Sequence, residues 1–352
     1  MDDIRIPLTA LKGRGAASRL PHRFESTARG AYDDGWDTLA VEHDERVLPK
    51  THVTFEDARS ILTHNDSPDI SFGQSLNPYR GCEHGCIYCY ARPSHSYLNL
   101  SPGLDFETRL IAKRNIGEVL RRELGNPRYV PQHTAIGTVT DAYQPIEREL
   151  RLTREVLQLF DETHHPFGIV TKSSGVERDL DLIAPMAARR LAAVYITITT
   201  LDGDLARRLE PRAASPQRRL RTIKTLAEAG VPVGVSVSPQ IPFINEDLEQ
   251  VLAAAWEAGA RNAFYQVIRL PWEVSPLFRE WLEVHYPQRA ARVMARIQEM
   301  RGGKDYDADF ATRMKGEGTW AQLIAQRFQR ATARPVSRTG CPAPRPTRAE
   351  TA

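Results

Sequence analysis

The sequence is poor in cysteine, in long hydrophobic runs and in excess charge of either sign. Its 352 residues include only four cysteines, which disfavours the disulfide framework of small secreted domains. The longest uncharged stretch, residues 229–245, contains three prolines and is too short for a transmembrane helix. The first fifteen residues carry early acids and no apolar core, unlike a signal peptide. We therefore expect a soluble, cytoplasmic protein with no membrane partner.

The small net charge of +3 is concentrated at the C-terminus. Residues 331–352 contain four arginines and one glutamate, which accounts for the whole excess and leaves the rest of the chain neutral. The same segment has four prolines and few apolar side chains, so we predict a disordered basic tail. Such a tail favours contact with nucleic acid, or it serves only as a solubilising terminus.

Local composition and periodicity divide the chain into four regions. The first mixes glycine, arginine and aspartate without periodicity, and its stretch GRGAASRLPHRFE (residues 13–25) is expected to wrap the body as an arm or to grip a ligand. We predict an irregular N-terminal extension, a partial barrel, C-terminal helices and the basic tail, over residues 1–50, 51–285, 286–330 and 331–352 respectively.

Through the second region, short apolar runs alternate with amphipathic helical segments. We predict strands over residues 71–77, 134–139, 168–171, 193–199, 231–238 and 263–268. We predict helices over residues 115–124, 152–163, 179–188, 216–229 and 247–258, followed by two more over 288–300 and 319–330. Nearly uncharged strands that alternate with helices indicate a parallel sheet with right-handed crossovers. Six such units predict an α/β fold, a partial (β/α)6 TIM-like barrel with extensions at both ends. Ligands of such folds sit beyond the carboxyl ends of the strands.

A cluster of thiols lies directly after the first predicted strand. Within NPYRGCEHGCIYCYAR the spacing is C-x3-C-x2-C, formed by Cys82, Cys86 and Cys89. Clustered thiols in a chain with few cysteines indicate metal ligands. Structural zinc takes four ligands, so a zinc site here needs His84 or the remote Cys341. A four-iron cluster would take the three cysteines and leave one iron open. Gly81 and Gly85 allow the loop to turn tightly.

With Tyr88 directly before its last cysteine, the motif resembles the signature of the radical S-adenosylmethionine (radical SAM) superfamily. Other segments resemble the branch around spore photoproduct lyase, often called DNA repair photolyase-like. These segments are GTVTDAYQPIE, IVTKSS, TITTLD, LEPRAASPQRRL and AGVPVGVSVSPQIPFIN, at residues 137–147, 169–174, 197–202, 209–220 and 229–245.

The resemblance implies a 4Fe–4S cluster on Cys82, Cys86 and Cys89, with S-adenosylmethionine on the open iron. An electron from an external donor such as flavodoxin or ferredoxin would cleave this cofactor to methionine and a 5′-deoxyadenosyl radical, which takes hydrogen from a substrate. Analogy favours a nucleic-acid base as substrate, and an enzyme of lyase-like or oxidoreductase type. The alternative is a non-catalytic protein that binds zinc or an iron–sulphur cluster and contacts nucleic acid.

The resemblance also suggests cofactor contacts at the strand ends. Lys172 would pair with the cofactor carboxylate, or it is a surface lysine. Thr138 and Asp141, at the end of the second predicted strand, would contact the cofactor's amino group, although Asp141 also suits a turn. Thr197 and Thr199 are two residues apart and share one face of their strand, where they would bind cofactor oxygens or simply pack.

Two tyrosines flank the last cysteine of the motif. Tyr88 is expected near the adenine. Tyr90, our catalytic candidate, matches a tyrosine thought to relay hydrogen in spore photoproduct lyase, or it packs beside the cluster. That lyase uses a cysteine donor in the region of GTVTD, which has no cysteine here, and Cys341 is the only spare thiol. We therefore do not expect repair of the spore lesion by that route.

Further polar residues have less specific expectations. Glu210 and Arg219 are expected to pair across the turn before the fourth helix. Arg80 and Arg92 bracket the cysteine motif, where they would raise the cluster's potential, meet a phosphate or remain solvated. Trp272 follows the sixth strand and either reaches the barrel mouth or packs in the core.

Overall fold

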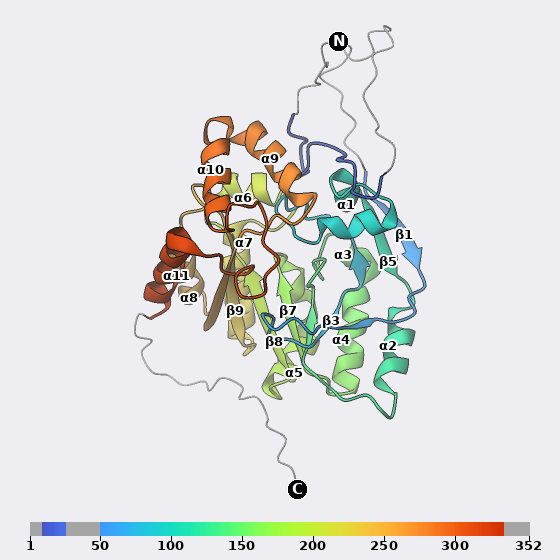
Figure 1. Ribbon diagram of the computed structural model, residues 1–352. Helices are drawn as coiled ribbons and strands as arrows, with labels where there is room; N and C mark the ends of the chain where they lie inside the picture. Colours follow the sequence, from blue (N-terminus) through green and yellow to red (C-terminus); the bar gives the residue numbers. More distant parts are fainter. Residues whose placement is uncertain (1–8, 26–49, 334–352) are drawn as a thin grey trace.

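The computed structural model describes residues 9–25 and 50–333, and within them a seven-stranded sheet forms the centre of the molecule (Figure 1). Its order is β10-β9-β8-β7-β6-β3-β2, in which β2 (Leu62–His64) pairs antiparallel to β3. The other six strands run parallel. They are β3 (Gln74–Leu76), β6 (Thr134–Ile136), β7 (Phe167–Thr171), β8 (Ala192–Thr197), β9 (Val233–Gln240) and β10 (Asn262–Val267). The predicted partial barrel is confirmed.

Five helices connect these strands, close to the predicted ranges. They are α2 (Ile116–Leu124), α4 (Leu152–Glu162), α5 (Leu180–Ala188), α7 (Pro216–Glu228) and α8 (Leu248–Glu257). Local chemistry fixes the ends of α7. The Ser215 hydroxyl accepts the Arg218 N–H at 3.3 Å, Pro216 occupies the first turn, and Gly230 follows the helix with φ of 77°.

Alternation along the strands separates the core from the barrel interior. Val194 and Ile196 of β8 are fully buried in the same core as Leu226 of α7. Because side chains alternate between faces, Thr197 and its register partner Ser236 of β9 face the barrel interior instead. The fold thus lines its interior with hydroxyl groups and covers its outside with aliphatic packing.

Several elements escape the sequence prediction because they are short or half exposed. A second sheet, of order β1-β5-β4, contains β1 (His52–Glu56), β5 (Arg109–Lys113) and β4 (Tyr79–Arg80). Small helical elements surround the mouth of the barrel: α1 (Leu104–Thr108), α3 (Glu147–Leu150), α6 (Gly203–Leu209) and the 3-10 helices η1 (Arg92–Leu98) and η2 (Ser174–Asp179). Near the C-terminus, α9 (Val274–His285) packs on α10 (Pro287–Glu299), and α11 (Gly318–Thr332) packs on α8.

A loop between α10 and α11 spans the open side of the barrel. At the end of β10, the Val267 N–H donates to the Met314 carbonyl at 2.9 Å. The neighbouring Arg313 donates to both carboxylate oxygens of Asp69, which lies between β2 and β3, and its Nη2–Oδ1 distance is 2.7 Å. The two ends of the sheet are therefore joined by side chains and loop backbone. We call this junction the seam.

The structure also corrects some predicted boundaries. β6 ends at Ile136 rather than at residue 139, so Thr138 and Asp141 lie in the following loop. β8 ends at Thr197, so Thr199 lies beyond the strand. The basic tail was predicted from residue 331, but α11 continues to Thr332.

The predicted division into four regions otherwise stays a prediction. Residues 9–25 contain neither helix nor strand, whereas most of the predicted extension, nearly all of the tail and Cys341 lie outside the described residues. In the part that the structure describes, no helix is long and apolar enough to cross a membrane.

Packing of β8 yields a direct test of the fold. The change Ile196→Ala removes a fully buried side chain and is expected to lower the free energy of unfolding by about 2–5 kcal/mol. Leu323→Ala, at an exposed position of α11, serves as the control and should change it by less than about 0.5 kcal/mol. Urea denaturation followed by circular dichroism measures both, and equal effects would contradict the assigned burial.

Candidate functional site

The three clustered cysteines lie on a loop between β4 and η1, at the mouth of the barrel. Gly81 and Gly85 of this cysteine loop (residues 81–90) adopt φ of 79° and 67°, as the sequence predicts. A Cβ on Gly81 would lie 2.9 Å from the Phe106 carbonyl oxygen, and one on Gly85 would lie 2.8 Å from Glu107 Oε2. The loop therefore needs glycine both for its backbone conformation and for its close packing.

The thiols of the loop are reduced and shielded from solvent. Cys82 and Cys86 are buried and Cys89 is partly buried. Burial raises the pKa of Cys86 to about 12, although the ammonium of Lys172 acts to lower it. Burial also raises the pKa of Cys82 well above its usual value, and the charge of Asp141 adds to this shift. A metal centre would have to displace these protons and would be stabilised by the nearby cation.

The arrangement of the thiols distinguishes between metal centres. In the residues that the structure describes, no three His, Cys, Asp or Glu side chains converge closely enough to hold one metal ion. The three cysteines and His84 are therefore not arranged around a single metal ion in the described structure. A four-iron cluster binds each cysteine to a different iron, so its thiols sit farther apart than the ligands of one ion. The number of the thiols and their place on one loop suit that group.

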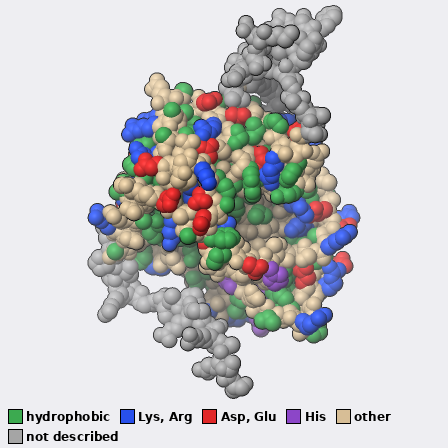
Figure 2. All heavy atoms as spheres, in the orientation of Figure 1, with side chains coloured by type: hydrophobic (Ala, Val, Ile, Leu, Met, Phe, Trp, Pro, Cys, Tyr) green, Lys and Arg blue, Asp and Glu red, His purple; other side chains and the backbone are tan. Residues whose placement is uncertain are grey.

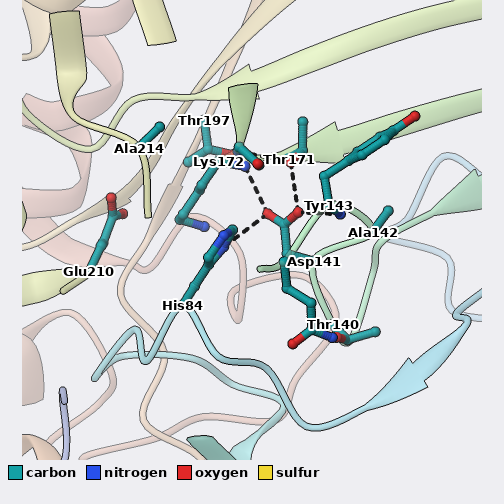
Figure 3. A network of polar contacts seen from close by, with 12 residues as sticks. His84, Thr140, Asp141, Ala142, Tyr143, Thr171, Lys172, Thr197, Glu210 and Ala214 are labelled. Carbon is teal, nitrogen blue, oxygen red and sulfur yellow. Dashed lines mark hydrogen bonds and ion pairs between the residues drawn. The ribbon is translucent and has the colours of Figure 1, made fainter. Parts of the chain in front are cut away.

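Asp141 joins the cysteine loop to the end of β7 (Figure 3). Its carboxylate accepts the backbone N–H groups of Lys172 at 2.8 Å and Tyr143 at 2.9 Å, and the Thr171 hydroxyl at 2.7 Å. His84 Nδ1 lies 3.3 Å from Oδ2, an ion-pair contact without hydrogen-bond geometry. Burial acts to raise the pKa of Asp141, but His84 and these donors together hold it far below its usual value. Asp141 is thus a carboxylate already committed to protein donors.

Glu210 forms a second buried centre, on the other side of Lys172. It accepts hydrogen bonds from Arg219, from the Tyr88 hydroxyl and from the Thr199 hydroxyl. Burial acts to raise the pKa of Glu210, but Arg219 and Lys172 outweigh it and hold this pKa below its usual value. The predicted pairing of Glu210 with Arg219 is confirmed.

The ammonium of Lys172 lies between these two carboxylates without bonding to either. Among the described residues, its ammonium makes no hydrogen bond or ion pair, and it lies 5.8 Å from the centre of the Tyr88 ring. Burial lowers the pKa of Lys172, but the charges of Cys86 and Glu210 raise it more. A cation kept charged beside the cysteine loop is available for an anionic group.

Tyr90 and Thr138 lie together toward the outer rim of the site. The Tyr90 hydroxyl donates to the Thr138 backbone carbonyl, and the Thr138 hydroxyl accepts from Asn77 Nδ2 at 3.1 Å. Above the Tyr90 ring, 4.5 Å from its centre, lies the guanidinium of Arg269. Within the described chain Arg269 makes no hydrogen bond or ion pair, while its neighbour Arg313 is paired with Asp69.

Sequence reasoning missed the groups that complete this site. Arg269 follows β10 in the segment IRLPW, whose only sequence signal is its place at a strand end. Ser238 Oγ, two residues before the end of β9, is buried without a hydrogen-bond partner in the described structure. The alternation in VGVSVS, where valines fill the core, was the signal for an inward-facing Ser238. His84 was weighed only as a zinc ligand, whereas it contacts Asp141.

Three further residues with less specific expectations lie in different environments. Arg80 donates to the Glu56 carboxylate at 3.0 Å on the surface. Arg92 is fully buried, so a solvated position for it is wrong. Trp272 is 61% exposed, which excludes core packing and leaves its ring at the surface after β10.

Sequence comparison places the chain among related proteins. The profile of the radical SAM superfamily matches residues 76–255, more than half of the chain. An uncharacterized protein of Mycobacterium tuberculosis is 33% identical over 246 residues, which cover 68% of this chain and 72% of that protein. An uncharacterized protein of Methanocaldococcus jannaschii is 30% identical over 213 residues, which cover 60% of this chain and 76% of that protein.

Structural comparison agrees with this placement. A variant of spore photoproduct lyase superposes with a TM-score of 0.51 at 16% identity, covering 79% of this chain and 78% of that one. Spore photoproduct lyase complexed with a dinucleoside spore photoproduct superposes with a TM-score of 0.50 at 16% identity and the same coverage. At such identity the likeness establishes the fold alone. The matched profile, the relatives and the barrel together show that the chain belongs to the radical SAM superfamily.

Proposed function

We propose that this protein binds a 4Fe–4S cluster through Cys82, Cys86 and Cys89 and uses S-adenosylmethionine to take a hydrogen atom from its substrate. The observation that carries the proposal is the cysteine loop itself. Three shielded thiols lie on one glycine-turned loop at the mouth of a partial barrel, beside the unpaired cation of Lys172.

When bound, the cluster and S-adenosylmethionine supply a one-electron cleavage that yields methionine and a 5′-deoxyadenosyl radical. The chain positions these groups and keeps water out. Lys172 suits the cofactor carboxylate because it is a partly buried cation with no acid bonded to it. Thr197 faces the interior beside Ser236, and its hydroxyl suits a cofactor oxygen.

The other predicted contacts take positioning roles in this proposal. The Asp141 carboxylate is filled by Thr171, Tyr143 and Lys172, so we assign it to orienting the cysteine loop and Lys172 rather than to gripping an ammonium alone. Through their hydroxyls, Tyr88 and Thr199 fix Glu210, and the Tyr88 ring remains available to pack against a base. Thr138 acts through its backbone carbonyl, which holds the Tyr90 hydroxyl.

For the substrate we favour a nucleic-acid base. A solved complex of spore photoproduct lyase holds a dinucleoside spore photoproduct, and the two folds are alike. In this chain the unpaired Arg269 above Tyr90 suits a phosphate close to a flat ring. Acidic and basic side chains are interspersed over the face shown in Figure 2, so any affinity for nucleic acid rests on specific contacts rather than on a one-signed surface.

The hydrogen route differs from that of the lyase. The region of GTVTD holds no cysteine, and the phenol of Tyr90, which directly follows the last cysteine, is hydrogen-bonded to the Thr138 carbonyl. We therefore assign hydrogen relay to Tyr90. The reducing electron comes from an external flavodoxin or ferredoxin, and we place the enzyme in the cytoplasm.

The cluster assignment predicts a clear effect of Cys86→Ala. After anaerobic reconstitution with iron and sulfide and reduction with dithionite, the unaltered protein should convert S-adenosylmethionine to 5′-deoxyadenosine. Cys86→Ala should lose both the brown cluster and the product, because one iron loses its ligand. Chromatography of the product and iron analysis provide the measurement. A colourless protein that retains only zinc would favour the non-catalytic alternative.

The role of Lys172 can be tested by binding alone. Lys172→Met keeps the length of the side chain and removes its charge, so affinity of the cluster-loaded protein for S-adenosylmethionine should fall about 10- to 100-fold, as expected for one charge-assisted hydrogen bond. Equilibrium dialysis measures the change. Lys224→Met, at an exposed position in α7, is the matched control, and equal affinities in both variants would exclude the assignment.

The substrate assignment predicts that Arg269→Gln weakens binding of a short single-stranded oligonucleotide about tenfold, because one guanidinium–phosphate contact is lost. Arg207→Gln alters an exposed arginine paired with Asp204 on α6 and should leave binding unchanged. Fluorescence anisotropy at fixed salt measures both variants. If neither the unaltered protein nor the variants bind the oligonucleotide, the nucleic-acid assignment fails while the cluster assignment stands.

A further inference from the structure

The N-terminal arm, residues 9–25, crosses the outside of the barrel mouth between α1 and α9 (Figure 1). It has no helix or strand of its own, yet several of its backbone groups are bonded to buried side chains. Gly15 and Ala16 donate their N–H groups to the two oxygens of Glu107, at 3.0 and 2.9 Å. Glu107 itself is fully buried. Because a buried carboxylate holds its backbone, this irregular segment does more than cover the surface.

Glu107 connects the arm to the cysteine loop through a second buried residue. Arg92 Nη2 pairs with Glu107 Oε1 at 2.6 Å, and neither side chain is exposed. From there, Arg92 donates to the carbonyls of Cys86 at 2.9 Å and Gly85 at 3.1 Å. One guanidinium therefore links the carboxylate that holds the arm to the backbone that carries the central cysteine.

The arm also touches the cysteine loop directly. A Cβ on Gly15 would lie only 1.8 Å from the Gly85 carbonyl oxygen, so the two backbones are packed as closely as glycine allows. Next to it, Ala16 is 1% exposed and packs in one apolar cluster with Cys86 and Tyr88. The arm thus closes a side of the cysteine loop that solvent would otherwise reach.

A second carboxylate fastens the far end of the arm. Glu273, at the start of α9, accepts the backbone N–H of Arg23 at 3.0 Å and its guanidinium at 2.8 Å. The same guanidinium lies 4.4 Å from the centre of the Trp272 ring and 5.2 Å from that of Tyr97. Between the two anchors, the Leu104 N–H donates to the Ser18 carbonyl at 3.2 Å. The arm is therefore held along its length.

We propose that the N-terminal arm is a working part of the cluster site: through Gly15, Glu107 and Arg92 it positions the backbone of the cysteine loop and shields the bound cluster from solvent and oxygen. The inference rests on the proposed function, because it assigns the arm to the cluster that Cys82, Cys86 and Cys89 would hold. Glu107 and Arg92 are positioning residues in this assignment, since they reach the cluster only through the loop backbone.

The decisive variant is Gly15→Ala, which forces the arm away from Gly85 without demanding a left-handed backbone. Gly203→Ala is the matched control, because a Cβ there meets nothing within 4 Å. Both proteins, full length and reconstituted anaerobically, are exposed to air while the visible absorbance of the cluster is followed. We expect the Gly15→Ala cluster to bleach roughly tenfold faster, the factor that corresponds to about 1.4 kcal/mol of lost arm docking, and the Gly203→Ala cluster to bleach at the unaltered rate.

Further measurements separate the possible failures. Equal bleaching rates in Gly15→Ala and unaltered protein, with equal iron and sulfide content, would overturn the role of the arm. Unaltered protein that binds no iron would instead overturn the proposed function. Should circular dichroism show that Gly15→Ala unfolds the barrel, Arg23→Ala decides the matter. It removes the guanidinium contacts of the far anchor without touching the cysteine loop, and faster bleaching in a fully folded protein supports the proposal whereas an unchanged rate overturns it.

Discussion

The mouth of this barrel depends on the need to surround its buried carboxylates with hydrogen-bond donors. Asp141, Glu210 and Glu107 each place a carboxylate among apolar side chains, which is unfavourable unless donors surround it. Backbone N–H groups and the Thr171 hydroxyl supply them for Asp141, an arginine and two hydroxyls for Glu210, and the arm with Arg92 for Glu107. These three centres fix the cysteine loop from different directions, so its geometry follows from charge satisfaction more than from secondary structure.

Against this matched background, two cations stand out because they are not bonded to acids. Lys172 lies between the centres of Asp141 and Glu210, and Arg269 lies above Tyr90. Among the described residues, the three buried carboxylates of the mouth are thus bonded to donors, whereas these two cations are not bonded to acids. In the proposed function, the cofactor carboxylate pairs with Lys172 and a substrate phosphate pairs with Arg269.

Much of the fold could be predicted from the sequence because its signals are local. Uncharged runs predict the six parallel strands, and Ser215, Pro216 and Gly230 are residues typical of the ends of a helix such as α7. Thr138 and Asp141 were placed on a strand because the apolar run continues past Ile136, whereas Gly137, with φ of 88°, ends it. The partners of Asp141 and the isolation of Arg269 depend on loops from distant parts of the chain meeting in space, which no local pattern records.

The seam between β10 and the β2–β3 edge is the place where the barrel is most easily opened. Adjacent strands elsewhere in the sheet are joined by ladders of backbone hydrogen bonds, whereas the seam is joined by the Arg313–Asp69 pair and by the single bond from Val267 to Met314. Separating the seam exposes one carboxylate and one guanidinium, which water solvates well. The separation disrupts no pair of hydrogen-bonded strands. Separation of the two sheet ends at the seam therefore breaks fewer hydrogen bonds than separation of two paired strands such as β7 and β8.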